Sequence, residues 1–366
     1  MRPNRGGGQT SVGEDVVDEP RGPLGARRAV LFTALSVGVV VVAIVSAGVG
    51  QLALSPAEVL DALLRPLGID LGTDPPPNAE AALWTIRLPR VAMALLVGAA
   101  LAAAGLLMQA VFGNPLAEPA VVGVSSGAAL GAAGAIVLGW TAFGGWTTAV
   151  AAFATGLVTT LVVYVSSRAG GRTEVVTLVL TGIAVNAVAQ AGLALFVFLG
   201  DTQSREEIVF WQLGSLNGSL WAEVGVVLPI VAVTSIAAAF LTRNLDLLSL
   251  GERSARHLGV NVELLRAGTI VLVALLVSAA VAFTGIIGFV GIVIPHLMRM
   301  VIGPAHGPLL VASLLGGALL LSVADLAART LVPYADLPIG MLTALVGGPF
   351  FFWLLRRTRA KAGGWG

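Results

Sequence analysis

Residues 267–298 read AGTIVLVALLVSAAVAFTGIIGFVGIVIPHLM and contain no Asp, Glu, Lys or Arg. A helix of roughly 20 apolar residues already crosses the hydrocarbon core of a bilayer. A second uncharged stretch covers residues 119–167. A water-soluble core does not require uncharged runs of this length, and the strands of a membrane barrel alternate in polarity instead. The two stretches therefore predict a helical membrane protein.

The composition of the whole chain supports this class. Of its 366 residues, 57% are hydrophobic and 11% are charged, whereas an ordinary globular domain carries about 25% charged residues. This balance excludes a soluble enzyme, a nucleic-acid binder and a disordered scaffold. The single lysine, Lys361, lies near the C-terminus, so the chain cannot contain the phosphate-binding loop GxxxxGK[ST] of an ATPase. We expect no catalytic site, and ATP hydrolysis would have to come from another chain.

Side chains that could hold a cofactor or a metal ion are scarce. The chain has no cysteine, which excludes iron–sulfur clusters and Cys–zinc sites. Its three histidines, His257, His296 and His306, lack the i, i+4 spacing of a helical metal site. We therefore expect this chain to bind neither a cofactor nor a metal ion, and His296 to be a structural hydrogen-bond donor.

Ten uncharged segments of spanning length predict an all-α polytopic membrane protein with ten transmembrane helices. The segments are 29–50, 91–112, 120–139, 146–167, 175–200, 224–242, 267–284, 286–303, 308–329 and 337–355. They form one transmembrane domain, 29–357, between a Gly-, Pro- and acid-rich tail (1–28) that we expect to be disordered and a short tail (358–366).

The distribution of basic residues predicts the orientation. If both termini face the cytoplasm, the inner loops and tails hold 16 of the 21 Lys and Arg residues, as the positive-inside rule requires. We therefore expect a multi-pass protein of the cell membrane, with both termini and the loop 243–266 in the cytoplasm. Arg87, Arg90 and Arg329 then lie on the outer side.

A stripe of small residues, Gly123, Gly127 and Gly131, recurs every four positions. In lipid, small residues let two helix backbones approach closely. The stripe is expected to pack within the subunit, with a subunit interface as the alternative.

The cytoplasmic loop 243–266 has the sequence RNLDLLSLGERSARHLGVNVELLR. Ser249 and Glu252 have the spacing of a capping box, and Gly259 stands where a helix would end in a left-handed conformation. We therefore expect a short helix over 250–258. It would pack on its own bundle or dock on a cytoplasmic partner.

Two further groups of polar residues, three arginines and two amides, each have two possible roles. Arg87 and Arg90 flank a proline in RLPR, and with Arg329 they either snorkel at the membrane surface or recognise carboxylates of an external partner. Asn186 and Gln190 share one helical face and either bond a neighbouring helix or line a polar pathway.

The glycine- and proline-rich stretches 113–119 and 285–299 predict broken helices.

Six stretches in this order resemble the permease subunits of binding-protein-dependent ABC importers, in the branch that imports iron–siderophore complexes, haem and vitamin B12. They are RLPR (87–90), GAALAAAGLLMQAVFGNPLAEPAVVGVSSGA (98–128), WQLGSL (211–216), LSLGERSARHLGV (248–260), GFVGIVIPHLMR (288–299) and LPIGMLTALVGGPFFFWLL (337–355). The resemblance spans about residues 29–357.

The resemblance implies the ten-helix permease fold of that family and its partners. These are a second permease subunit (the same chain or a homologue), two cytoplasmic ATPase subunits that use ATP and Mg, and an external substrate-binding protein. It implies that an ATPase groove receives the coupling residues, which are Leu250, Gly251, Glu252, Ala255, Leu258 and Gly259. It also implies that Arg87, Arg90 and Arg329 receive acidic residues of the binding protein. An iron–siderophore complex is the expected cargo, with haem and vitamin B12 as alternatives.

Two rival functions belong to other classes. An ion-gradient-driven secondary transporter usually carries carboxylates at the membrane midplane. The carboxylates nearest to the predicted segments instead fall at helix ends or in loops: Glu118, Glu174, Asp201, Asp325 and Asp336. An intramembrane enzyme needs a nucleophile with a base, or a metal site, and the sequence offers neither at a workable spacing. We therefore favour alternating access of a permease driven by separate ATPase subunits.

Overall fold

The computed structural model describes residues 23–50, 52–73, 76–169 and 172–361. The long helices are α1 (Pro23–Gly48), α4 (Leu88–Phe112), α6 (Thr147–Ser166), α7 (Val175–Leu199), α9 (Trp221–Leu248), α11 (Val262–Thr284), α13 (His306–Thr330) and α14 (Ile339–Lys361). The shorter helices are α2 (Pro56–Leu64), α3 (Ala79–Ala82), α5 (Val124–Val137), α8 (Thr202–Leu213), α10 (Glu252–His257) and α12 (Val290–Ile302). Brief helical segments are η1 (Arg65–Leu67), η2 (Leu83–Arg87), η3 (Pro119–Val122) and η4 (Gly144–Trp146), and β1 (Arg168–Ala169) pairs with β2 (Arg172–Thr173).

The predicted ten-helix membrane fold is confirmed. Within the described residues, seven helical stretches are long and apolar enough to cross a bilayer, and α5, α12 and residues 339–352 of α14 are shorter apolar helices. Each matches one predicted segment. Helices α2 and α8 were not predicted. Helix α1 begins at Pro23, ahead of the expected boundary at residue 28, and the rest of the predicted tail lies outside the described residues.

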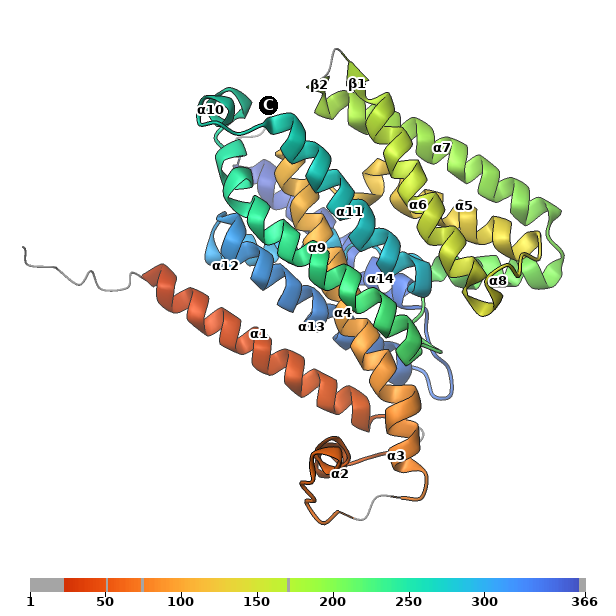
Figure 1. Cartoon of the computed structure of the whole chain (residues 1–366). Coiled ribbons are helices and arrows are strands. Elements are labelled where there is room, and N and C mark those ends of the chain that lie inside the picture. Colours follow the sequence, from red (N-terminus) through yellow and green to blue (C-terminus); the bar gives the residue numbers. More distant parts are fainter. Residues whose placement is uncertain (1–22, 51, 74–75, 170–171, 362–366) are drawn as a thin grey trace, which may run out of the picture.

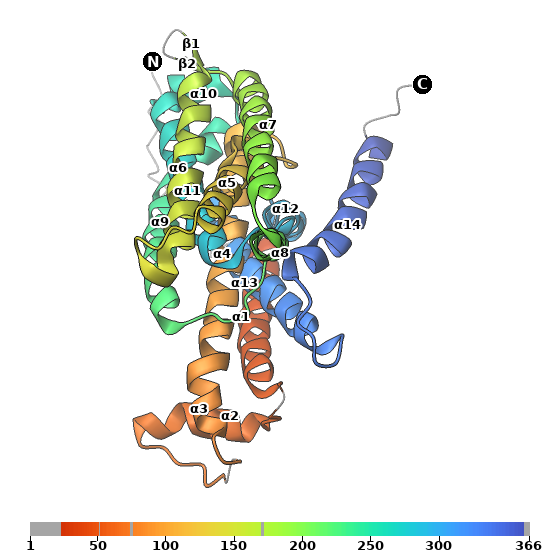
Figure 2. The ribbon, with the colours of Figure 1, turned by 90° about the vertical axis from the view of Figure 1, so that its right-hand side faces the viewer.

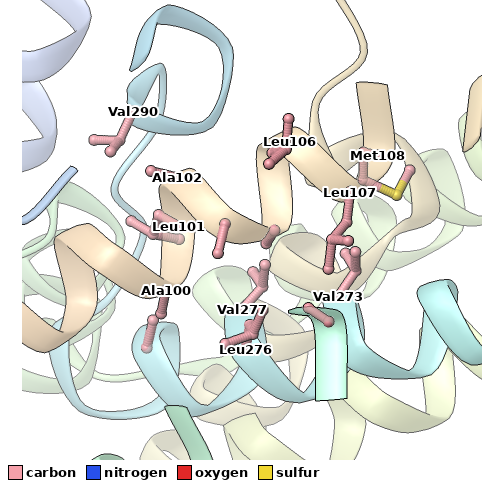
Figure 3. Close-up of a cluster of buried hydrophobic side chains, with 14 of the residues drawn as sticks. Ala100, Leu101, Ala102, Leu106, Leu107, Met108, Val273, Leu276, Val277 and Val290 are labelled. Atoms are coloured by element: carbon pink, nitrogen blue, oxygen red, sulfur yellow. The ribbon is translucent and has the colours of Figure 1, made fainter. Parts of the chain in front are cut away.

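Helix α4 forms the centre of the bundle and contacts α9, α11, α12 and α13 (Figure 1). Its middle is rich in alanine and glycine, so neighbouring backbones come very close. A Cβ built on Gly98 would lie 2.2 Å from the carbonyl oxygen of Gly317 on α13. Leu101, Leu107 and Met108 of α4 belong to the same buried hydrophobic cluster as Val273 and Val277 of α11 (Figure 3).

The bundle has two ends, which we name after the short helices that lie there. Helix α4 begins beside α2 and α3, at the α2 end, and finishes at Phe112, at the α10 end (Figure 1). Figure 2 shows α14 leaning away from the other helices, although it contacts α8, α12 and α13.

Helices α5 and α12 are half-length elements that begin inside the bundle. With 14 and 13 residues, each is about 20 Å long at 1.5 Å per residue. Residues 113–122 return from the α10 end into the bundle before α5 starts, and Phe289, with φ 66°, begins α12 next to the centre of α4. The predicted helix breaks are therefore present.

The small-residue stripe packs within the subunit. A Cβ on Gly127 would lie 2.1 Å from Oγ1 of Thr159, and one on Gly131 would lie 2.0 Å from Oγ1 of Thr155. Both threonines belong to α6. The stripe thus seats α5 on α6, which confirms the intramolecular interpretation.

Candidate functional site

The predicted surface helix exists as α10, but the capping box is wrong. Ser249 caps the C-terminal end of α9, and its Oγ donates a hydrogen bond to the carbonyl of Asp246 at 2.6 Å. Gly251, with φ 101°, turns the chain before α10 starts at Glu252. The serine hydroxyl is therefore already committed to the preceding helix. Gly259, with φ 87°, ends the element as expected.

Helix α10 is shorter than the predicted 250–258, and the residues in and beside it divide between the bundle and solvent. Ala255 is fully buried, whereas Leu250 and Leu258 are 64% and 59% exposed. The carboxylate of Glu252 pairs with the buried guanidinium of Arg266 on α11. Ala255 and Glu252 thus fix α10 to the bundle, while the side chains of Leu250 and Leu258, on either side of the helix, are exposed.

A cavity of about 510 Å³ with a mixed polar and apolar lining lies beside α10. Gln109, Glu252, Arg266, Arg299 and His306 are among the residues that line it. Gln109 accepts a hydrogen bond from Nη1 of Arg299 at 3.0 Å. His306, at the start of α13, contacts Asp246 through its ring at 2.6 Å, which ties the ends of α9 and α13 together beneath α10.

The three predicted docking arginines gather at the α2 end, where all of them are engaged within the chain. Arg90 pairs with Asp325 and with Asp336, each at 2.9 Å. Arg329 lies 3.3 Å from the other oxygen of Asp325 and donates to the Ser46 carbonyl at 3.0 Å.

Arg87 is 7% exposed and donates to the carbonyls of Ala47 and Gly48 at 2.9 and 3.0 Å. Its guanidinium thus satisfies the open carbonyls at the end of α1. The three arginines form an internal clamp between α1, α4 and α13 rather than snorkelling at the surface. Sequence reasoning missed the clamp because its acidic members lie more than 200 residues from Arg90.

The two amides predicted for the pathway, Asn186 and Gln190, have different surroundings. Asn186 donates to the Ala120 carbonyl at 3.3 Å and accepts a hydrogen bond from Ser126, so it joins α7 to the start of α5. Gln190 is exposed on α7. The Nδ1 atom of His296 is buried and has no hydrogen-bond partner among the residues that the structure describes, so that nitrogen is not the satisfied donor that the sequence led us to expect.

Glu118 is the residue whose position sequence reasoning missed. It lies in a loop, as predicted, but the loop enters the bundle, and the carboxylate lines a cavity of about 60 Å³ with Leu101 and Ser125. Leu101 precedes the end of α4 at Phe112 by about 16 Å at 1.5 Å per residue, which is roughly half of a bilayer core. The expectation that Glu118 stays away from the midplane is therefore wrong.

A second large cavity, of about 580 Å³, opens where α8, the α11–α12 break and α14 meet. Its lining includes Gln212, Phe289, Met341 and Leu345 and is mostly apolar. Among the described residues, no three His, Asp or Glu side chains gather closely enough to hold a metal ion.

Comparisons with known proteins agree with this architecture. The FecCD transport family matches residues 38–357. The chain is 41% identical over 294 residues to the hemin transport system permease protein HmuU of Yersinia pestis, covering 78% of this chain and 88% of that protein. It is 39% identical over 287 residues to the cobalamin import system permease protein BtuC of Halobacterium salinarum, covering 78% and 76%.

A solved structure shares the fold. It shows a metal-chelate type ABC transporter in an inward-facing conformation, with a TM-score of 0.79 and 33% sequence identity over 90% of this chain and 99% of that chain. The family match covers most of the sequence, and the relatives are similar over most of their own length. The chain therefore belongs to the FecCD transport family and is a membrane permease of the ABC importer type.

Proposed function

We propose that this permease carries a metal-chelate complex, in the first place an iron–siderophore, which an external binding protein delivers. Separate ATPase subunits would drive the transport by alternating access. Family membership, together with the similarity to a metal-chelate type transporter, is the observation that carries this proposal. Haem and vitamin B12 are alternative cargoes, because the relatives named above transport hemin and cobalamin.

The geometry of the α10 end supports docking of an ATPase there. The coupling residues Leu250 and Leu258 present their side chains outward, while Ala255 anchors the helix. Leu250 precedes α10 and Leu258 follows it, so exposed apolar side chains flank a helix that is fixed to the bundle. This arrangement suits a groove in a partner, because α10 contacts both α9 and α11. Gly251 and Gly259 hold the turns on either side.

We further propose that the 580 Å³ cavity between α8, the α11–α12 break and α14 belongs to the transport pathway. Its mostly apolar lining would let a bulky chelate pass without binding tightly. A second permease subunit, either the same chain or a homologue, would close the open side of the cavity. Neither Asn186 nor Gln190 is among the residues that line this cavity, so their role in the pathway remains a prediction.

Docking of the binding protein on Arg87, Arg90 and Arg329 remains a prediction. In this structure the three guanidinium groups are bonded within the chain, so an external carboxylate would have to compete with these partners. The clamp supports docking indirectly, since it fixes the α2 end to which a binding protein would come.

Transport in vesicles tests the proposal. The permease, its ATPase and its binding protein are reconstituted, and uptake of a radiolabelled ferric siderophore is measured with and without ATP. Uptake that requires ATP and the binding protein, and that ignores ionophores, supports the importer. Uptake that an ionophore abolishes in ATP-free vesicles would instead show a secondary carrier. Competition by haem or vitamin B12 identifies the cargo.

A further inference from the structure

Glu118 is hydrogen-bonded to a strained residue. Its Oε1 accepts the backbone N–H of Phe289 at 3.3 Å. Phe289 has φ 66°, a left-handed conformation that is uncommon for a bulky side chain and persists only where the surroundings enforce it. Glu118 supplies a side-chain bond that holds this residue from the side of α4.

Helix α14 holds Phe289 from the other side. A Cβ built on Gly347 would lie 2.4 Å from both Cβ and Cγ of Phe289, so the phenyl group rests on the bare backbone of α14. Phe289 and Gly288 also line the 580 Å³ cavity, whereas Gly288 and Glu118 line the small one. The break between α11 and α12 is thus the common wall of the two cavities.

The bond needs an acceptor oxygen rather than a negative charge. Among the described residues no Lys, Arg or His nitrogen lies within salt-bridge distance of Glu118. Within the described part of the chain, its hydrogen-bond partner is the backbone N–H of Phe289, at the start of α12. A neutral amide of the same length can accept that hydrogen bond as well as a carboxylate can.

We propose that Glu118 is a positioning residue: its acceptor oxygen holds the α11–α12 break so that Phe289 stays seated on α14 at the wall of the large cavity. The part of this inference that concerns transport rests on the proposed function, because the cavity is assigned to the pathway there. The part that concerns the break rests on the bond and the backbone geometry alone.

Two substitutions at Glu118 separate the acceptor from the charge. Glu118→Gln keeps an acceptor and should leave uptake per ATP hydrolysed within about twofold of the wild type. Glu118→Met keeps the length but leaves the Phe289 donor unsatisfied, which should lower uptake about tenfold. Glu80→Met, at an exposed position of α3, controls for the loss of a carboxylate.

A second pair of variants reaches Phe289 from α14. Gly347→Ala should displace the phenyl ring and reproduce the effect of Glu118→Met. Gly348→Ala is the matched control, because a Cβ there meets nothing within 4 Å. This pair keeps the inference testable if Glu118→Met fails to insert.

Hydrogen–deuterium exchange of residues 285–293 in nanodiscs gives a readout that does not depend on transport. Exchange should be faster in Glu118→Met and Gly347→Ala and unchanged in Glu118→Gln and both controls. Loss of uptake in Glu118→Gln equal to that in Glu118→Met would show that the charge is required and overturn the inference, as would unchanged exchange in Glu118→Met. If the wild-type complex shows no ATP-driven uptake, the proposed function is refuted. The exchange measurement would still test whether Glu118 holds the α11–α12 break.

Discussion

The guanidinium of Arg90 on α4 and the carboxylate of Asp325 on α13 form a buried ion pair, with 2.9 Å between Nε and Oδ1. The Asp325 side chain is fully buried, and its second oxygen lies 3.3 Å from Nε of Arg329. One carboxylate thus faces two arginines, while Asp336, which is 34% exposed, supplies the second negative charge of the cluster. The cluster fastens the α2 ends of α4 and α13, whose backbones meet closely at Gly98 and Gly317.

Replacing Asp325 should destabilise the fold strongly. Asp325→Asn removes the charge that faces Arg90 and Arg329, and losing one partner of a buried pair costs about 3–5 kcal/mol. Asp336→Asn is the matched control, for which the more exposed pair predicts a loss of about 1 kcal/mol or less. Thermal unfolding in detergent measures both. Equal losses for the two variants would contradict a buried role for Asp325.

Arg87 has two candidate roles, one in stabilising the clamp and one in docking the binding protein, and they can be tested separately. Because its guanidinium satisfies carbonyls at the end of α1, Arg87→Gln should lower the free energy of unfolding by about 2 kcal/mol, since hydrogen bonds to charged groups are the stronger ones. If Arg87 instead receives an acid of the binding protein, charge reversal at Arg87 and Arg90 should weaken docking and make it more sensitive to salt. Surface plasmon resonance at two salt concentrations, read beside the unfolding curve, distinguishes these outcomes.

The sequence predicts the number and type of the spanning helices because uncharged length is a local property, visible within each segment. It also predicts the breaks at 113–119 and 285–299, where glycine and proline mark them. It does not predict the pairing of Arg90 with Asp325 or the depth of Glu118. Both depend on how distant segments fold back beside α4, and no local pattern encodes that. The misplaced capping box at Ser249 has a local cause, since a serine between two helices can bond to either one, and here its hydroxyl bonds to Asp246 of the preceding helix.

The coupling helix offers a test of docking at the α10 end. Leu258 is 59% exposed, so Leu258→Asp should leave the protein inserted and stable but uncouple ATP hydrolysis from uptake. Ala255 is fully buried, so Ala255→Asp should destabilise the helix itself. ATP hydrolysis and uptake measured in the same vesicles give the ratio. Normal coupling in Leu258→Asp would remove the role proposed for this helix.

The loop that follows α2 should loosen in acid. A hydrogen bond from the Thr73 hydroxyl, together with one from the Leu71 amide and the nearby Arg65 guanidinium, lowers the pKa of Asp61 below its ordinary value of 3.8. A lowered pKa stabilises the folded loop at all pH values above 3.8 and loses this contribution as the pH falls through the lower, folded-state pKa. Limited proteolysis across this range should show cleavage of 65–73 increasing at low pH. Asp61→Asn should be cleaved at neutral pH already, and an unchanged pattern would contradict the assignment.

The orientation of the chain can be tested with single cysteines, because the natural sequence has none. Ser254 on α10 and Thr141, which follows α5, are both exposed, and the charge distribution predicts that they lie on opposite sides of the membrane. In intact cells, an impermeant thiol reagent should label Thr141→Cys and spare Ser254→Cys, whereas inverted vesicles should give the reverse. Labelling of Ser254→Cys from outside would place α10 beyond the reach of a cytoplasmic ATPase. In that event the coupling role of Leu250 and Leu258 would fail together with the predicted orientation, even though the family and the fold would stand.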